Sequence, residues 1–286
     1  MYEECKKCDI KQVDKICTIL KLDSYRREEL RNKVISFLDK VDMDKTNPEV
    51  MGDIWEIISE DIKNENPYKD VKTYLNKKLL NSLPYLKKLV YDSSCPKKTA
   101  LQLAIAGNLI DFAASHKFEE EDIEKKLIEI TKKELSINHS EEMFKDVESA
   151  ESILYLGDNC GEIVLDKLFI TVLKENYPNL EIYYGVRGKP IVNDVTVEDA
   201  KEVKMNEVSQ VLSNGDGSLG TELKKTSSEF NKIFNDVHMV ICKGQGNYES
   251  LINCNRENLY FMFMAKCNMV AKPLNIPTMS VVCMKK

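Results

Sequence analysis

From residue 153 onwards, short apolar runs alternate with segments of helical periodicity, and this alternation limits the possible folds more than any other feature of the chain. The apolar runs span residues 153–156, 180–186, 237–242, 259–265 and 278–284. Buried strands that alternate with helices are typical of a mostly parallel sheet with helices on both faces. We therefore predict an α/β fold for residues 149–286.

Residues 1–148 have a different pattern, in which apolar side chains recur at helical spacing and no strand is expected. Interruptions at Asn47-Pro48, at Asn66-Pro67 and near Pro84 should separate the helices. No Gly-, Ser- or Pro-rich linker divides the two parts of the chain near residue 148. We therefore expect an all-helical domain of residues 1–148, packed on an α/β domain of residues 149–286 and contributing to the active-site cleft.

The composition argues against several classes of protein. A formal net charge of −6 argues against broad nucleic-acid binding, which needs clustered Lys and Arg. No apolar stretch reaches the length of a membrane span, and the first residues have no apolar signal core. Nine cysteines without a secretion signal suggest reduced thiols. We therefore expect a cytoplasmic protein that binds neither nucleic acid nor membrane.

Three of the predicted strands lead through a polar, glycine-bearing loop into a helix. The loops span residues 157–162, 187–194 and 243–247. In a parallel sheet, all of them emerge at the carboxyl ends of the strands, where open α/β sheets bind ligands. Together they place carboxylates, amides and cations at one edge of the sheet: Asp158, Asn159, Arg187, Asn193, Asp194, Lys243, Gln245 and Asn247.

These residue types suit a metal ion together with a phosphate. Carboxylate and amide oxygens prefer a hard divalent ion such as Mg²⁺ or Mn²⁺. An Arg, a Lys and the N–H groups of a helix N-terminus bind phosphate, and a metal with such cations is the equipment for phosphoryl transfer. Each loop alone could instead be a turn or a helix cap, and Glu162 could cap its helix rather than contact an ion.

One helix of the N-terminal part, over residues 99–114, is apolar or small on almost every side, as expected for a buried helix. Asn108 and Asp111 lie three residues apart on one face of it. Buried polar groups need partners, which are either other core groups or a cleft with a ligand. Gly107 weakens the helix and indicates close approach of another segment, so we favour the cleft.

Two further motifs carry less weight. Residues 215–220 fit the pattern G-x-G-x-x-G, but Val211-Leu212 before them is a poor strand, and the region near residue 240 is apolar rather than acidic. We expect a flexible loop bordering the phosphate site there, not a dinucleotide site. Cys5 and Cys8 form a C-x-x-C without a second pair to complete a zinc site, so packed or exposed thiols are the simpler interpretation.

The three loops resemble the signatures of the damage-control metal phosphatases, a family formerly known only as a domain of unknown function. The similar stretches are residues 156–164, 187–200 and 243–249. Residues 106–111 resemble the family's helical-domain motif, and Tyr260-Phe261 with Ala265-Lys266-Cys267 resemble its late strand. The resemblance extends from about residue 96 to the end, and the C-x-x-C is similar to that of stand-alone microbial members.

The resemblance implies a divalent-metal-dependent phosphatase that hydrolyses phosphate monoesters of small metabolites, such as sugar phosphates or damaged cofactor intermediates. It implies that Asp158, Asn159 and Asp194 bind the metal, which is Mn²⁺, Co²⁺, Ni²⁺ or Mg²⁺. It also implies that Lys243 contacts the phosphate, with either an activated water or a site carboxylate as nucleophile. The expected substrate- and phosphate-binding residues are Asn108, Asp111, Arg187, Asn193, Gly244, Gln245 and Asn247.

The sequence leaves two other functions open. The first is an S-adenosylmethionine-dependent carboxyl methyltransferase, an activity proposed for a eukaryotic branch of the same family. Such an enzyme needs a nucleoside-binding turn and an acid for the ribose, whereas the second loop supplies Arg187 and Asp194. The second is a non-catalytic protein that binds a phosphorylated metabolite or a metal. Neither the physiological substrate nor the oligomeric state follows from the sequence.

Overall fold

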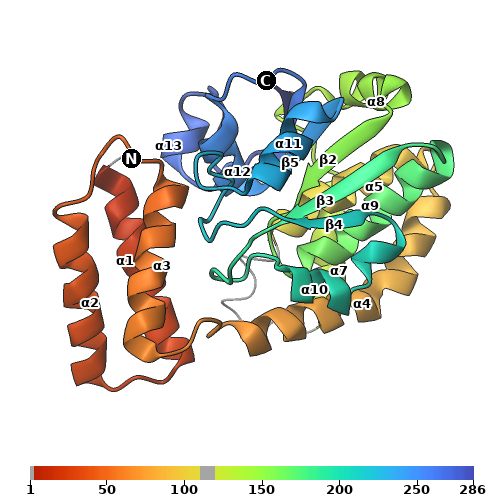
Figure 1. Cartoon of the computed structure of the whole chain (residues 1–286). Helices are drawn as coiled ribbons and strands as arrows, with labels where there is room; N and C mark the ends of the chain where they lie inside the picture. Colours follow the sequence, from red (N-terminus) through yellow and green to blue (C-terminus); the bar gives the residue numbers. More distant parts are fainter. Residues whose placement is uncertain (1–2, 110–119) are drawn as a thin grey trace.

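The predicted α/β fold is confirmed by a computed structural model, which describes residues 3–109 and 120–286 (Figure 1). The described strands form one sheet of seven in the order β1-β7-β6-β5-β2-β3-β4, and all neighbours are parallel except β6 and β7. The strands are β1 (Ile137–Asn138), β2 (Ser152–Leu156), β3 (Glu181–Val186), β4 (Gln210–Ser213), β5 (Met239–Lys243), β6 (Leu259–Met264) and β7 (Val281–Lys285).

Helices cover both faces of the sheet, which explains why the central strands are apolar without interruption. On β2, Ile153 and Tyr155 face one helical layer, and Leu154 and Leu156 face the other. The first layer contains α4 (Lys69–Tyr91), α5 (Pro96–Ala106), α7 (Glu120–Thr131), α8 (Ser140–Ser149) and α9 (Glu162–Asn176). The second contains α11 (Ser228–Asp236), α12 (Gly244–Leu251) and α13 (Asn268–Ala271).

The first three helices form a separate core beside the sheet (Figure 1). They are α1 (Glu3–Ile19), α2 (Ser24–Leu38) and α3 (Asn47–Ile62). Ile191 and Val192, from the loop between β3 and α10 (Val197–Glu202), are buried in this core. The helical core therefore holds in place a loop that sequence analysis assigned to the candidate site.

The strand order fixes where a ligand should bind. From β2 the chain proceeds to β3 and β4 on one side, whereas β5 and β6 lie on the other side of β2. The order therefore reverses between β2 and β5, and loops leaving the carboxyl ends of these strands diverge. Such a switch point is where open α/β sheets bind their ligands.

Several sequence predictions are wrong in detail. The helix expected to break near Pro84 is continuous as α4, because Pro84 lies on the exposed side, where water can bond the freed carbonyl group. Val211-Leu212, predicted to be a poor strand, lies in β4, whose position at the edge of the sheet accounts for its weak apolar pattern. The N-terminal part is not wholly helical, since the two-residue strand β1 pairs with β7.

The helix expected near Tyr248 begins at Gly244, directly after β5. Gly244 has a φ of +77°, which glycine adopts without strain, so the chain turns from strand to helix with no intervening loop. The remaining short 3₁₀ segments are η1 (Gly107–Leu109) and η2 (Met205–Glu207).

The division of the chain near residue 148 stays a prediction. Helices α4 and α5 pack on α9 and share one hydrophobic core with the strands, so residues from both sides of the predicted boundary contribute to that core. Within the described residues, no helix combines the length and the apolar character needed to cross a membrane.

We predict that Ile191→Ala lowers the free energy of unfolding by about 2–5 kcal/mol. The side chain is 0% exposed and fills the core of α1–α3, so its loss leaves a cavity. As a control, Ile19→Ala removes the same atoms from a side chain that is 38% exposed and should cost roughly 1 kcal/mol or less. Urea denaturation measures both values, and equal losses would contradict the role given to Ile191.

Asp9 of α1 gives the stability a predictable dependence on pH. Its side chain is 2% exposed, and burial raises its pKa from 3.8 to about 7, although a hydrogen bond with Asn47 acts in the opposite direction. Folding raises the pKa of Asp9, so the protonated side chain favours the folded state. Its contribution to the free energy of unfolding is fully present below about pH 4 and is lost as the pH rises through 7. Asp9→Asn should therefore unfold at higher urea concentration than the wild type at pH 8, with little difference near pH 4. A difference that does not change with pH would contradict this assignment.

Candidate active site

Asp158 and Asn159 lie in the turn between β2 and α9, at the switch point of the sheet. The Oδ2 atom of Asp158 accepts hydrogen bonds from Nδ2 of Asn159 at 2.7 Å and from Nδ2 of Asn108 at 2.8 Å. The structure therefore brings Asn108, from η1 of the helical part, onto the predicted metal ligand. Asp111, the other polar residue predicted on that helix, lies outside the described residues.

The loop between β3 and α10 runs back across the first turn and places Asp194 beside Asn159. An antiparallel bridge pairs these two residues. The backbone N–H of Val195 donates to the carbonyl of Asp158 at 2.8 Å, and the N–H of Cys160 donates to the carbonyl of Asn193 at 2.9 Å. The three predicted metal ligands, Asp158, Asn159 and Asp194, are thus held together by backbone hydrogen bonds.

Arg187 holds both carboxylates from the side of β3. Its Nε donates to Oδ2 of Asp194 at 2.7 Å, and its terminal nitrogen lies 3.9 Å from Oδ1 of Asp158. The other guanidinium N–H groups donate to Thr221, Asn247 and the carbonyl of Leu219. A buried guanidinium engaged on so many sides has little freedom left, so Arg187 orients Asp194.

The electrostatics of the turn favour a bound cation. Burial raises the pKa of Asp158 well above its usual value, and the negative charges of Asp194 and Glu162 raise it further. The positive charges of Lys266 and Arg187 act in the opposite direction. A divalent ion between Asp158 and Asp194 would offset this repulsion and stabilise both ionised carboxylates.

The side chains present fit a hard divalent ion. Carboxylate and amide oxygens from Asp158, Asp194 and Asn159 are the ligand types that Mg²⁺ and Mn²⁺ prefer. Within residues 3–109 and 120–286, no three side chains of His, Cys, Asp or Glu cluster as a metal site. No disulfide joins the nine cysteines, all of which lie within the described residues.

Lys243, predicted to contact the phosphate, lies underneath the turn and is 0% exposed. Its Nζ is 2.6 Å from Oε1 of Glu162, 2.5 Å from Oδ1 of Asp166 and 2.8 Å from the carbonyl oxygen of Ala104. Burial disfavours its charge, but the two carboxylates outweigh burial and raise the pKa of Lys243. The ammonium group donates hydrogen bonds to Asp166 and to the carbonyl of Ala104, and its contact with Glu162 is an ion pair.

Glu162 and Asp166 connect Lys243 to the rest of the site. Oε2 of Glu162 accepts hydrogen bonds from Nδ2 of Asn108 at 3.3 Å and of Asn159 at 3.2 Å. The carboxylate of Asp166 accepts hydrogen bonds from the hydroxyl groups of Tyr155 at 2.8 Å and Tyr184 at 2.9 Å. Glu162, which sequence analysis left as either a cap or a site residue, therefore orients the amides that surround Asp158.

Two glycines allow the strands to meet this network closely. A Cβ atom on Gly244 would lie 2.0 Å from Oδ2 of Asp158, so only glycine lets the first turn of α12 approach the carboxylate. A Cβ atom on Gly157 would lie 2.4 Å from the hydroxyl oxygen of Tyr184. Gly244, predicted to contact substrate, thus lies directly against the predicted metal ligand.

Asn247 and Gln245, both predicted to bind phosphate or substrate, contact protein groups. Asn247 accepts from Arg187 at 3.0 Å and Thr221 at 2.8 Å, and donates to the carbonyls of Gly157 and Lys243. Both lone pairs of the amide oxygen and both N–H groups of Asn247 are therefore used within the protein, and they connect the loops that follow β2, β3 and β5. Gln245 accepts from the backbone N–H of Lys266 at 2.9 Å.

Lys266 is a candidate that the sequence analysis did not assign to the site. It follows β6 and is half-buried, and its charge lowers the pKa of Asp158. The signal was available, because β6 is another parallel strand whose carboxyl end reaches the same edge of the sheet. Asp166 also had a signal, since it lies four residues after Glu162, on the same side of α9.

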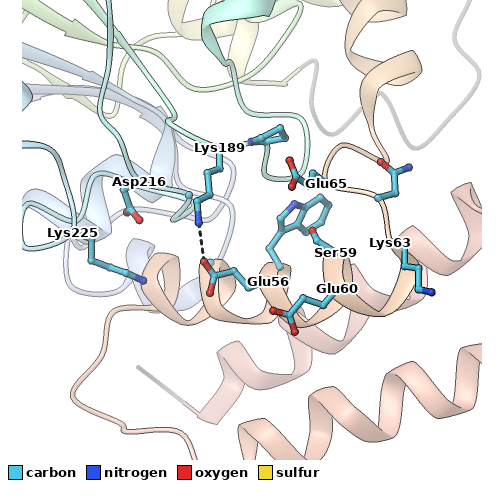
Figure 2. A pocket seen from close by; sticks show the side chains of 13 residues that line it. Glu56, Ser59, Glu60, Lys63, Glu65, Lys189, Asp216 and Lys225 are labelled. Carbon is cyan, nitrogen blue, oxygen red and sulfur yellow. Dashed lines mark hydrogen bonds and ion pairs between the residues drawn. The ribbon is translucent and has the colours of Figure 1, made fainter.

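A cavity of about 620 Å³ lies between α3 and the loops that follow β3 and β4 (Figure 2). It includes Asp216 and Gly217 from the glycine-rich stretch that sequence analysis expected to border a phosphate site. Lys189 forms an ion pair with Glu56 at 3.2 Å across it, and Lys225 pairs with Asp53 at 3.3 Å. The lining carboxylates outnumber the lining lysines, so the cavity offers little attraction for a phosphate; the carboxylates are Glu56, Glu60, Glu65 and Asp216, and the lysines are Lys63, Lys189 and Lys225.

Comparison with known proteins places this geometry in one family. Residues 1–282 match the family model described as the damage-control phosphatase ARMT1-like domain. A crystal structure of a DUF89 family protein from Pyrococcus horikoshii superposes with a TM-score of 0.92 at 31% identity, covering 100% of this chain and 98% of that one.

Curated relatives give the same result. A damage-control phosphatase of Pyrococcus horikoshii is 40% identical over 186 residues, and this alignment covers 65% of the chain and 64% of that relative. A damage-control phosphatase of Archaeoglobus fulgidus is 33% identical over 74% of the chain and 73% of its own length. An uncharacterized protein of Methanocaldococcus jannaschii is 32% identical over 99% of the chain and 94% of its own length.

We predict that Lys243→Met destabilises the fold by about 3–5 kcal/mol, because it leaves Glu162 and Asp166 buried without their cation. Lys88→Met is the matched control, because Lys88 forms an exposed ion pair with Asp92 and such pairs contribute little to stability. Thermal and urea unfolding measure both. A Lys243→Met variant as stable as the control would show that the buried ammonium is dispensable for folding.

Proposed function

This chain belongs to the damage-control phosphatase family, and on that premise we propose that it hydrolyses phosphate monoesters of small metabolites in a divalent-metal-dependent reaction. Names of the relatives support a phosphatase of metabolite repair. The observation that carries the finer proposal is the convergence of Asp158, Asn159 and Asp194 at the switch point of the sheet. Sugar phosphates and damaged cofactor intermediates are the proposed substrates.

In this proposal, Asp158, Asn159 and Asp194 hold the ion, which is Mn²⁺, Co²⁺, Ni²⁺ or Mg²⁺. When bound, the ion supplies a Lewis acid that withdraws charge from the phosphoryl oxygens. Arg187 fixes the orientation of Asp194, and Asn108 fixes that of Asp158. Lys243 acts through Glu162, which orients the amide of Asn159, rather than by touching the phosphate.

Lys266 is the proposed phosphate-contacting cation. It is half-buried and its charge acts on Asp158, whereas Lys243 lies beneath the turn, is 0% exposed and is paired with Glu162 and Asp166. Its charge would stabilise the oxygens of the transferring phosphoryl group in a largely buried setting. The first turn of α12 directs backbone N–H groups towards the same region, because Gly244 lies against Asp158.

We predict that Asp158→Asn lowers the rate of metal-dependent hydrolysis of an aryl phosphate by at least roughly a hundredfold. Mutating a residue that only hydrogen-bonds a metal ligand already lowers metal affinity or activity by about 10–100-fold, and loss of a direct ligand should cost at least as much. Asp216→Asn is the matched control. Asp216 also follows a strand and is 8% exposed, the same as Asp158, but lies in the neighbouring cavity. Initial rates with Mn²⁺ and calorimetric Mn²⁺ binding are measured for both variants.

Asp216→Asn should keep the wild-type rate and the wild-type affinity for Mn²⁺. The proposal is wrong if Asp158→Asn keeps full activity and metal affinity. It is also wrong if the wild type hydrolyses no phosphate ester with any of the four metal ions.

A further inference from the structure

We propose that a second cavity, formed by α1 and the loop between β3 and α10, binds a small hydroxylated organic anion. The cavity has a volume of about 570 Å³, which is within the usual range for small-molecule sites. One wall is the face of α1 that carries Lys11, Gln12 and Lys15, and the opposite wall contains Val192 and Asn193. It is distinct from the cavity of Figure 2, with which it shares no lining residue.

Two residues that line this cavity each carry a buried polar atom with no partner within the described part of the chain. Asn193 is 4% exposed, and its Nδ2 donates no hydrogen bond. Oε1 of Gln12, on the facing helix, is also buried without a donor. Native proteins leave few such groups, because burial without a partner is costly. A ligand that satisfies both atoms must offer an acceptor to Asn193 and a donor, such as a hydroxyl group, to Gln12.

The charges around the cavity select an anion. Lys11 and Lys15 are exposed one helical turn apart on α1, and neither forms an ion pair with any residue that the structure describes. Asp14, the acidic residue of this wall, is already paired with Arg31 at 2.8 Å. The cavity therefore presents two available ammonium groups and no available carboxylate among its described lining residues. A carboxylate or phosphate group is the complementary ligand.

The cavity is coupled to the candidate active site through one loop. Asn193 precedes Asp194, and its carbonyl accepts the N–H of Cys160 in the metal-binding turn. Val192 has a φ of +43°, which is unusual for a β-branched residue and persists here because the helical core packs around its side chain. A ligand bound to the Asn193 amide thus contacts a conformationally constrained segment that also carries Asp194.

The anion has two possible sources, a free metabolite or the second anionic group of a substrate. Gluconate tests the first, because it carries a carboxylate and hydroxyl groups but no phosphate. 6-Phosphogluconate tests the second, because its phosphate ester can occupy the active site while its carboxylate occupies the cavity. Trp55 is the single tryptophan, and its ring lies 5.8 Å from that of Tyr68, which lines the cavity, so intrinsic fluorescence follows binding together with calorimetry.

The test compares two double variants that remove the same charge. Lys11→Ala with Lys15→Ala removes the cavity's ammonium groups, whereas Lys40→Ala with Lys232→Ala removes two exposed lysines that lie outside the cavity lining and outside α1. At constant ionic strength, gluconate should bind the wild type and the control equally. The cavity variant should bind it at least about tenfold more weakly, because charge-assisted hydrogen bonds are lost. Asn193→Ala should weaken binding as well.

Kinetic measurements then show whether the anion is a free metabolite or part of the substrate. Only these measurements rest on the proposed function. For a free metabolite, gluconate changes the rate of aryl phosphate hydrolysis in the wild type and not in the cavity variant. For a substrate group, the cavity variant has a KM for 6-phosphogluconate raised about tenfold and unchanged aryl phosphate kinetics. If the chain hydrolyses no ester, the proposed function fails, and the binding comparison still decides this inference. Absence of saturable binding, or equal weakening in both double variants, would overturn it.

Discussion

The buried ion cluster of Lys243, Glu162 and Asp166 is the interaction on which the rest of the site depends. It joins the end of β5 to α9, and through the carbonyl of Ala104 it also joins the end of α5. Charges this deeply buried are tolerated only when they are paired with opposite charges. The ion pair with Lys243 fixes Glu162, which in turn orients the two amides around Asp158. A structural ion cluster below the turn thus sets the geometry of the functional residues above it.

A second constraint comes from the helical core of α1–α3. The loop that carries Asp194 buries Ile191 and Val192 in that core before it crosses the turn of Asp158. The proposed metal ligands are therefore supported by two hydrophobic cores, one that includes the sheet and one beside it. Support from rigid elements on both sides keeps coordinating side chains in position before an ion or a substrate binds. It also explains why α1 and the β3–α10 loop enclose a cavity so close to Asp194.

The sequence was sufficient to predict the sheet, its helical layers and the convergence of Asp158, Asn159 and Asp194, because carboxyl ends of parallel strands meet at one edge. The sequence was less informative about the direction in which individual side chains point. Lys243 was expected to face the ligand, yet Met239 and Ile241 face α9, and the two-residue period of a strand points Lys243 the same way. The contact of Asn108 with Asp158 depends on how helices from the N-terminal part dock, which local patterns do not encode. The continuity of α4 through Pro84 depends likewise on solvent on that side of the helix.

The central claim is that one divalent ion is held between the first two site loops. Anomalous diffraction from crystals soaked in Mn²⁺ tests it most directly, because the signal locates the metal without reference to activity. We expect a peak bounded by oxygens of Asp158, Asn159 and Asp194 at roughly 2.0–2.3 Å, the distances typical of hard divalent ions. A peak located instead at Cys5 and Cys8, or no peak at the turn of Asp158 at saturating Mn²⁺, would contradict it.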